Sequence, residues 1–232
     1  MLTQKLTLLT EDCDAKRELR LSRLFQLLQE ISIADTEALG YPREKTLDKG
    51  LLWVLGKQRV EISRLPVYGE KVVLTSYPGK RIPFLFPRHC VMETEGGELL
   101  LKASSVWALI DQKTRVMVNP EEHGVVIEGK EEGGEIPFQF PMKSFPLMGR
   151  VCFQAEWRDC DLNGHLNNTA YLDKAENLIP IPFLLSFSPK EIEIAYRKEI
   201  PLGEKTEVSY GEENGTYVFS CPEFFLRLLF QR

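Results

Sequence analysis

The fold prediction starts from residues 15–40, A-K-R-E-L-R-L-S-R-L-F-Q-L-L-Q-E-I-S-I-A-D-T-E-A-L-G. Its apolar residues recur three or four positions apart, which is the spacing of one face of an α-helix. This stripe consists of Leu21, Leu24, Phe25, Leu28 and Ile31. Asp14 is a residue type that caps helices, and Gly40 followed by Pro42 is a typical stop. The pattern predicts a helix from about Ala15 into the late thirties.

Segments typical of β-strands flank this helix on both sides. The opening L-T-Q-K-L-T-L-L-T is rich in threonine and leucine and precedes it. After the helix, segments rich in β-branched and aromatic residues are separated by short turns. They cover residues 50–62, 70–79, 84–94, 98–111 and 114–118. The first 118 residues therefore predict a strand, a long helix and an antiparallel meander.

The same order of elements then starts again. Residues 121–148 are rich in proline, glycine and glutamate, lack sustained periodicity and are predicted to be a linker. Beyond it we expect a strand at 149–157, a loop at 158–168 and a helix that extends to about Leu178. Four further strands are predicted at 191–200, 205–211, 216–220 and 224–230. The chain is interpreted as a tandem duplication of architecture, because the two helix entries share little beyond D-C-D.

A helix with one apolar stripe and an antiparallel meander bury that stripe against one face of the sheet. Each unit is therefore predicted to be α+β, with one antiparallel sheet wrapped around a long central helix, as in the hotdog arrangement. Two units, at 1–120 and 149–232, predict a tandem (double) hotdog. Its two sheets would run side by side, with a ligand site between the halves.

Composition narrows the class of protein. The 232 residues are 43% hydrophobic and carry a net charge of −5, which argues against a disordered chain and against nonspecific nucleic-acid binding. Residues 121–135, with six glutamates and one lysine, account for all of that charge, so a local basic face remains possible. The five cysteines form no C-x-x-C pair, and the N-terminus lacks a signal pattern. We expect a cytoplasmic protein with free thiols and no membrane span, since no apolar run is long enough to cross a bilayer.

The densest polar cluster of the sequence lies between the first strand and the helix of the second unit. It contains Asp159, Asp161, Asn163, His165, Asn167 and Asn168. Loops at helix N-termini concentrate backbone N–H donors, which suit a polarised carbonyl or an oxyanion. Asp and Asn are also ordinary cap and turn residues, so composition alone leaves a purely structural role open.

The segment D-L-N-G-H-L-N-N-T-A-Y at 161–171 resembles the D-x-N-x-H-x-N-N-x-x-Y segment of the acyl-acyl-carrier-protein thioesterases of plants and bacteria. Residues 60–79 and 97–120 also resemble the N-terminal hotdog of that family, so the resemblance spans nearly the whole chain. It implies an enzyme that hydrolyses fatty acyl-carrier-protein thioesters to free fatty acid and holo carrier protein, which terminates fatty acid synthesis.

The resemblance also implies which residues are catalytic. By position in the motif these are Asp161, Asn163 and His165, together with a strand glutamate that the family carries within R-R-E-C. The best match to that tetrapeptide keeps the glutamate as Glu199 but has Ile200 in place of the cysteine. A mechanism with a cysteine nucleophile therefore fails at this position. The family also often has a tryptophan near the place of Lys174.

Thioester hydrolysis needs a base or nucleophile, a donor for the carbonyl oxygen and shelter for the acyl chain. We hypothesise that Asp161 is the nucleophile or general base and that His165 assists proton transfer or polarises the thioester. Asn163 would orient the water or a catalytic side chain, and Glu199 would position the water. The helix N-terminus near Asn167 and Asn168 would supply oxyanion donors. The sequence leaves attack by Asp161 and direct attack by water both open.

The first unit lacks N-G-H, which predicts one active site per chain. The resemblance implies that this unit instead lines the acyl-chain pocket, for which the candidates are Trp53, Leu55 and Val60. Acyl-carrier protein is strongly acidic, so its docking requires a basic patch. The candidate cations are Lys80, Arg81, Arg88, Arg197 and Lys198.

No metal or cofactor is expected, since His89 and His123 lack a second ligand at metal spacing and no phosphate-binding glycine motif is present. Cys160 is interpreted as a small buried side chain. Two other functions remain open: an acyl-coenzyme A thioesterase on the same fold, and a noncatalytic acyl-binding hotdog protein. The assembly would be a monomer with an internal pseudo-dimer, or a homodimer.

Overall fold

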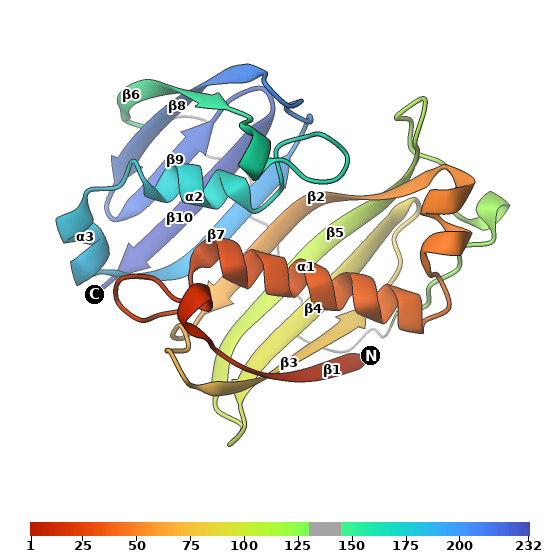
Figure 1. Cartoon of the computed structure of the whole chain (residues 1–232), viewed down its shortest axis with the longest axis horizontal. Helices are drawn as coiled ribbons and strands as arrows, with labels where there is room; N and C mark the ends of the chain where they lie inside the picture. Colours follow the sequence, from red (N-terminus) through yellow and green to blue (C-terminus); the bar gives the residue numbers. More distant parts are fainter. Residues whose placement is uncertain (130–144) are drawn as a thin grey trace.

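The computed structural model describes residues 1–129 and 145–232, whose strands form one ten-stranded antiparallel sheet (Figure 1). Along the sheet the order is β1-β3-β4-β5-β2-β7-β10-β9-β8-β6. The strands are β1 (Leu2–Thr7), β2 (Leu51–Ile62), β3 (Lys71–Pro78), β4 (Leu85–Thr94), β5 (Leu99–Asp111), β6 (Leu147–Gln154), β7 (Ser188–Tyr196), β8 (Lys205–Glu213), β9 (Thr216–Ser220) and β10 (Phe224–Gln231). The first five strands make one half of the sheet and the last five make the other.

The two halves are joined by hydrogen bonds between β2 and β7, which pair from Lys57 opposite Ala195 to Glu61 opposite Glu191. The prediction that two sheets run side by side is therefore confirmed. At the joint the buried guanidinium of Arg59 lies 3.2 Å from Glu191 and 3.0 Å from Glu61. A charge that is removed from water is costly unless it is paired, and these carboxylates provide the partners.

The helix of the first unit, α1 (Leu21–Ala38), lies on one face of the sheet and contacts β1, β3 and β4. Its predicted stripe is buried, and Leu24, Leu28 and Ile31 are 0 to 1% exposed. The helix begins at Leu21, however, and not near Ala15. The prediction that Asp14 caps it is wrong, because the Asp14 carboxylate accepts the backbone N–H groups of a separate tight loop.

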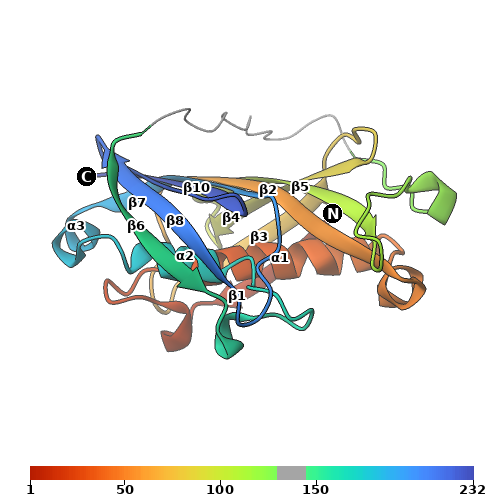
Figure 2. The same ribbon diagram turned by 90° about the horizontal axis from the view of Figure 1, so that it is seen from above.

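The second unit does not contain the single long helix that the pattern predicts. Its helices are α2 (Ala170–Glu176), seven residues long, and α3 (Ile181–Ser186). α2 ends close to the predicted end near Leu178, but it begins only at Ala170, and Pro180, which disfavours a helical conformation of the residue before it, separates α2 from α3. All three α-helices lie on one face of the sheet (Figure 2), and α2 contacts α1.

Two predictions between the units need correction. Residues 114–118 form no strand. After the turn that follows β5, Met117 makes an isolated β-bridge to Ile110. The start of the predicted linker 121–148 packs on the first unit, because Val125 and Ile127 are buried against Trp107 and Leu109. Residues 130–144 of the linker lie outside the described residues, and β6 already begins at Leu147.

Short 3-10 helices complete the description. They are Thr10–Asp12, Arg43–Lys45, Leu47–Lys49, Glu121–His123 and Trp157–Asp159. The main apolar core lies between the helices and the sheet and includes residues of both units, such as Phe25 and Leu226. Within the described ranges, no helix is long and apolar enough to cross a membrane.

Candidate active site

A tight loop before α2 holds three of the predicted catalytic residues. The Asp161 Oδ1 atom accepts hydrogen bonds from the backbone N–H of Asn163 (2.8 Å) and of His165 (3.3 Å). Gly164 turns the chain with a φ of +78°, a conformation that glycine adopts at little cost. The Asn163 side chain also donates to Asp161 Oδ2 at 3.3 Å. The carboxylate of Asp161 therefore organises the loop, which fixes its own orientation.

The same loop is built at the start of the first unit. There Asp14 Oδ1 accepts the N–H of Lys16 (2.8 Å) and of Glu18 (3.0 Å), and Arg17 takes the positive φ. Lys16 and Glu18 occupy the places of the asparagine and histidine and pair with each other at 2.9 Å. The duplication thus extends to hydrogen bonding and to the aspartate itself, while the asparagine and the histidine occur in the second loop alone.

The fourth predicted residue faces this loop from the segment that follows β7. The Glu199 Oε2 atom lies 3.5 Å from His165 Nε2, longer than an ordinary hydrogen bond, and 3.0 Å from Arg115 Nη2. Glu199 is 45% exposed and His165 is 19% exposed, so both side chains remain accessible from solvent. The structure therefore brings Glu199 to His165 across two segments that are separate in sequence.

A cavity of about 860 Å³ connects these residues to the first unit. Asp161, Asn163, His165 and Glu199 all line it. The first unit contributes an apolar part, which includes Trp53, Leu55, Phe86 and Trp107. Its size and partly apolar lining are typical of a small-molecule site.

Of the predicted pocket residues, Trp53 and Leu55 line the cavity, and the Trp53 ring meets Phe86 edge-on with centroids 4.9 Å apart. Val60 does not line it. Its side chain is fully buried in the main core together with its β5 neighbour Ala103. The register shift after Leu55 places Leu55 and Val60 on the same face of the sheet, so Val60 is separated from the cavity by its position along β2.

Asn167 and Asn168, the two predicted oxyanion donors, make different contacts. The Asn167 N–H donates to the Asp159 carbonyl at 2.8 Å, and its side chain accepts from Thr169, so its predicted role as a backbone donor is wrong. Asn168 lines the cavity, and its carbonyl accepts a 2.7 Å hydrogen bond from the Tyr196 hydroxyl. Burial raises the pKa of Tyr196 well above its ordinary value, which keeps the phenol as the donor.

The five candidate cations do not form one patch. Arg197 and Lys198 are exposed beside the cavity, Lys80 is exposed, and Arg81 pairs with Glu121 at 2.9 Å. Arg88 is buried and cannot face a docking partner. Its guanidinium pairs with Asp35 of α1 and donates to Ser76 (3.0 Å) and Thr36 (2.8 Å).

Cys160, which precedes Asp161 in the chain, is only partly buried, so the prediction of a buried side chain is wrong, but its thiol is poorly suited to nucleophilic attack. Burial, with the nearby carboxylates of Asp159 and Asp161, raises the pKa of Cys160, which disfavours its thiolate. Ile200, at the place of the family's cysteine, is buried in the core. In residues 1–129 and 145–232 no three potential ligands converge on a metal site.

Sequence reasoning missed two residues at the site. Tyr196 and Arg115 contact Asn168 and Glu199, respectively. Tyr196 lies in the middle of the predicted strand 191–200, where no polar pattern marks it, and it is the last residue of β7. Arg115 was assigned to a strand that does not exist, and its partner lies in the other unit, so no local signal identified it.

Comparison with known proteins supports this architecture. Among solved structures, an acyl-ACP thioesterase from Bacteroides thetaiotaomicron superposes with a TM-score of 0.87 at 20% identity and covers 99% of this chain and 97% of that one. A 12:0-ACP thioesterase from Umbellularia californica gives 0.84 at 16% identity, with 99% and 96% coverage. The fold is therefore that of the double hotdog thioesterases.

The sequence identifies the family. Residues 1–123 match the acyl-ACP thioesterase N-terminal domain, and residues 149–222 match the acyl-ACP thioesterase C-terminal domain. The chain belongs to the acyl-ACP thioesterase family. A palmitoyl-acyl carrier protein thioesterase of Gossypium hirsutum chloroplasts is 26% identical over 226 residues, which cover 85% of this chain and 51% of the relative. The chain thus spans about half the length of the curated relatives it matches.

Proposed function

We propose that this protein hydrolyses the thioester of fatty acyl-carrier protein to free fatty acid and holo carrier protein, thereby ending acyl-chain growth. The observation that carries the proposal is the cavity, in which Asp161, His165 and Glu199 of one unit share a space with apolar residues of the other. Family membership supports the same reaction.

The residues divide the chemical work. A water molecule adds its oxygen to the acyl carbon, the C–S bond breaks, and the thiolate of the carrier takes up a proton. Asp161 acts as the base for that water, or as a nucleophile whose acyl adduct the water then cleaves, and Asn163 and Glu199 orient the reacting groups. His165 transfers the proton or polarises the carbonyl. The N–H of Asn168 is the remaining candidate donor to the oxyanion.

The two units divide substrate recognition from chemistry. The first unit (1–120) holds the acyl chain, because Trp53, Leu55, Phe86 and Trp107 supply the apolar wall of the cavity. The second unit (149–232) supplies the four polar residues. Two of the three compared proteins are named for palmitoyl and 12:0 substrates, so the preferred chain length of this protein has to be measured separately.

The carrier docks at the edge of the cavity beside Arg197 and Lys198, which are exposed there. Arg81 also lines the cavity, where it pairs with Glu121 at 2.9 Å. Acidic partners are steered by such cations, and the effect weakens with salt.

The test is product analysis with purified protein and matched acyl thioesters of carrier protein and of coenzyme A, in a series of chain lengths. We expect free fatty acid, with a higher kcat/KM for the carrier thioester at one or two lengths. A higher kcat/KM for coenzyme A thioesters would identify these, and not the carrier thioesters, as the substrate. Tight acyl binding without release of thiol would make the protein a noncatalytic acyl-binding protein.

A further inference from the structure

Arg115 connects the first unit to the predicted catalytic residues of the second. Its Nη2 atom lies 3.0 Å from Glu199 Oε2, the same oxygen that faces His165 Nε2 at 3.5 Å. Arg115 also lines the cavity. One carboxylate oxygen is thus placed between a guanidinium from one unit and an imidazole from the other.

The turn that carries Arg115 is tightly built. The Asp111 Oδ1 atom accepts the N–H of Lys113 (3.1 Å) and of Thr114 (2.7 Å) and the Thr114 hydroxyl (2.9 Å). The Arg115 N–H in turn donates to the Asp111 carbonyl at 2.9 Å. The backbone at Arg115 is therefore fixed by hydrogen bonds within the turn.

Arg115 itself has a φ of +58°, in the left-handed region that glycine and asparagine adopt most easily. A long side chain in this conformation costs free energy that the surrounding structure compensates, and such residues cluster at functional sites. The strain and the contact with Glu199 occur at the same residue, although glycine would serve the turn better.

We propose that Arg115 is a positioning residue for the hydrolytic reaction: it holds the Glu199 carboxylate toward His165. Glu199 is 45% exposed and has three flexible side-chain torsions, so it needs a partner to keep one orientation. The inference rests on the proposed function. It also makes the acyl-binding unit part of the catalytic arrangement, because the guanidinium that orders Glu199 comes from the turn after β5.

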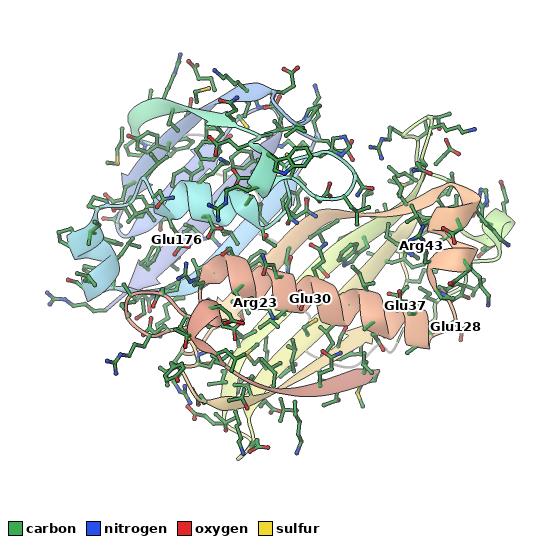
Figure 3. All side chains as sticks on the ribbon, in the orientation of Figure 1. Arg23, Glu30, Glu37, Arg43, Glu128 and Glu176 are labelled. Carbon is green, nitrogen blue, oxygen red and sulfur yellow. The ribbon has the colours of Figure 1, made fainter. Side chains whose placement is uncertain are left out.

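Attraction of the acidic carrier is the competing role for Arg115. A second cavity of about 510 Å³ opens beside the first and is lined by both Arg115 and Arg43, the latter labelled in Figure 3. Arg43 pairs with Asp48 at 2.8 Å, whereas the charged partners found for Glu199 among the described residues are Arg115 and His165. A docking role would raise KM for the carrier thioester, whereas a positioning role lowers kcat.

The test uses Arg115→Asn, which tolerates the left-handed backbone, and Arg115→Lys, which keeps the charge. Lys113→Gln is the matched control, since it removes a cation from the same turn and keeps the hydrogen bond from the Lys113 backbone to Asp111. We expect Arg115→Asn to lower kcat roughly ten- to hundred-fold with little change in KM, because misplaced groups lose that much rate. Arg115→Lys restores part of the loss, and Lys113→Gln behaves as wild type. A small uncharged acyl thioester without the carrier shows the same loss.

The second measurement compares kcat of the two single variants with kcat of the double variant. In a Glu199→Gln background, Arg115→Asn is expected to cause no further loss of kcat, because both substitutions remove one interaction. The inference would be overturned if Arg115→Asn lowered kcat as much in the Glu199→Gln background as in the wild type. It would also be overturned if Arg115→Asn alone left kcat unchanged or only raised KM. An inactive wild type overturns the proposed function and this inference with it, whereas an active wild type with unaffected variants overturns this inference alone.

Discussion

Glu176 is expected to make the free energy of unfolding depend on pH. It lies on α2, on the side near the start of α1 (Figure 3), and is half-buried. Burial, followed by the carboxylates of Asp173 and Asp14, raises the pKa of Glu176 to about 8, against the lowering effect of Lys16 and Arg20. The side chain therefore reports on the contact between α2 and the first unit.

The sign follows from the two protonation states. An unfolded glutamate has a pKa of about 4.3, so between about pH 4.3 and 8 the folded protein holds a proton that the unfolded chain has lost. Stability contributed by this group therefore falls as the pH rises through that window. At about 1.4 kcal/mol per unit the limit is roughly 5 kcal/mol, and partial exposure reduces it to about 2 kcal/mol.

Glu176→Gln removes the ionisable group and keeps its shape. In urea unfolding we expect the variant to match wild type near about pH 4 and to be more stable by about 2 kcal/mol near about pH 9. Glu37→Gln, at an exposed position near the end of α1, is the control and should show no such pH dependence. A Glu176→Gln variant with the same stability as wild type at both pH values, or a less stable one at pH 9, would refute the reasoning.

Three further predictions concern the site. His165→Ala should abolish thioester hydrolysis while circular dichroism shows a folded protein; near-wild-type turnover would remove His165 from the mechanism. Glu199→Ala should lower kcat and keep the melting temperature, because Glu199 is largely exposed; a lower melting temperature with normal turnover per folded molecule would indicate a structural glutamate instead. KM for the carrier thioester should rise with salt, and Lys198→Gln should flatten that dependence; a KM that is insensitive to salt would contradict carrier docking at this edge.

The elements and the site loop were predictable because their signals are local. The stripe at Leu24, Leu28 and Ile31 identified α1, and the polar letters from Asp161 to His165 lie within five consecutive residues. Asp14 shows the limit of a local signal. An aspartate before a helix can cap it or close a tight turn, and the letters do not distinguish the two.

The remaining errors have long-range causes. Arg88 appeared to be a surface cation because no acidic residue is near it in sequence, but its partner Asp35 comes from α1. Val60 and Leu55 lie on the same face of β2, but Val60 packs in the main core and Leu55 lines the cavity, and their sequence does not show where along the strand the cavity ends. Arg115 meets Glu199 only after β2 and β7 have joined the two units.

We propose that the cavity between the units is a thioester hydrolase site centred on Asp161. Its most direct test is the rate of free fatty acid release from an acyl-carrier-protein thioester by wild type, Asp161→Ala and Asp173→Asn, the last being an exposed aspartate on α2. We predict rapid release by wild type and Asp173→Asn and none above background by a folded Asp161→Ala. Release by Asp161→Ala at the wild-type rate would contradict the account.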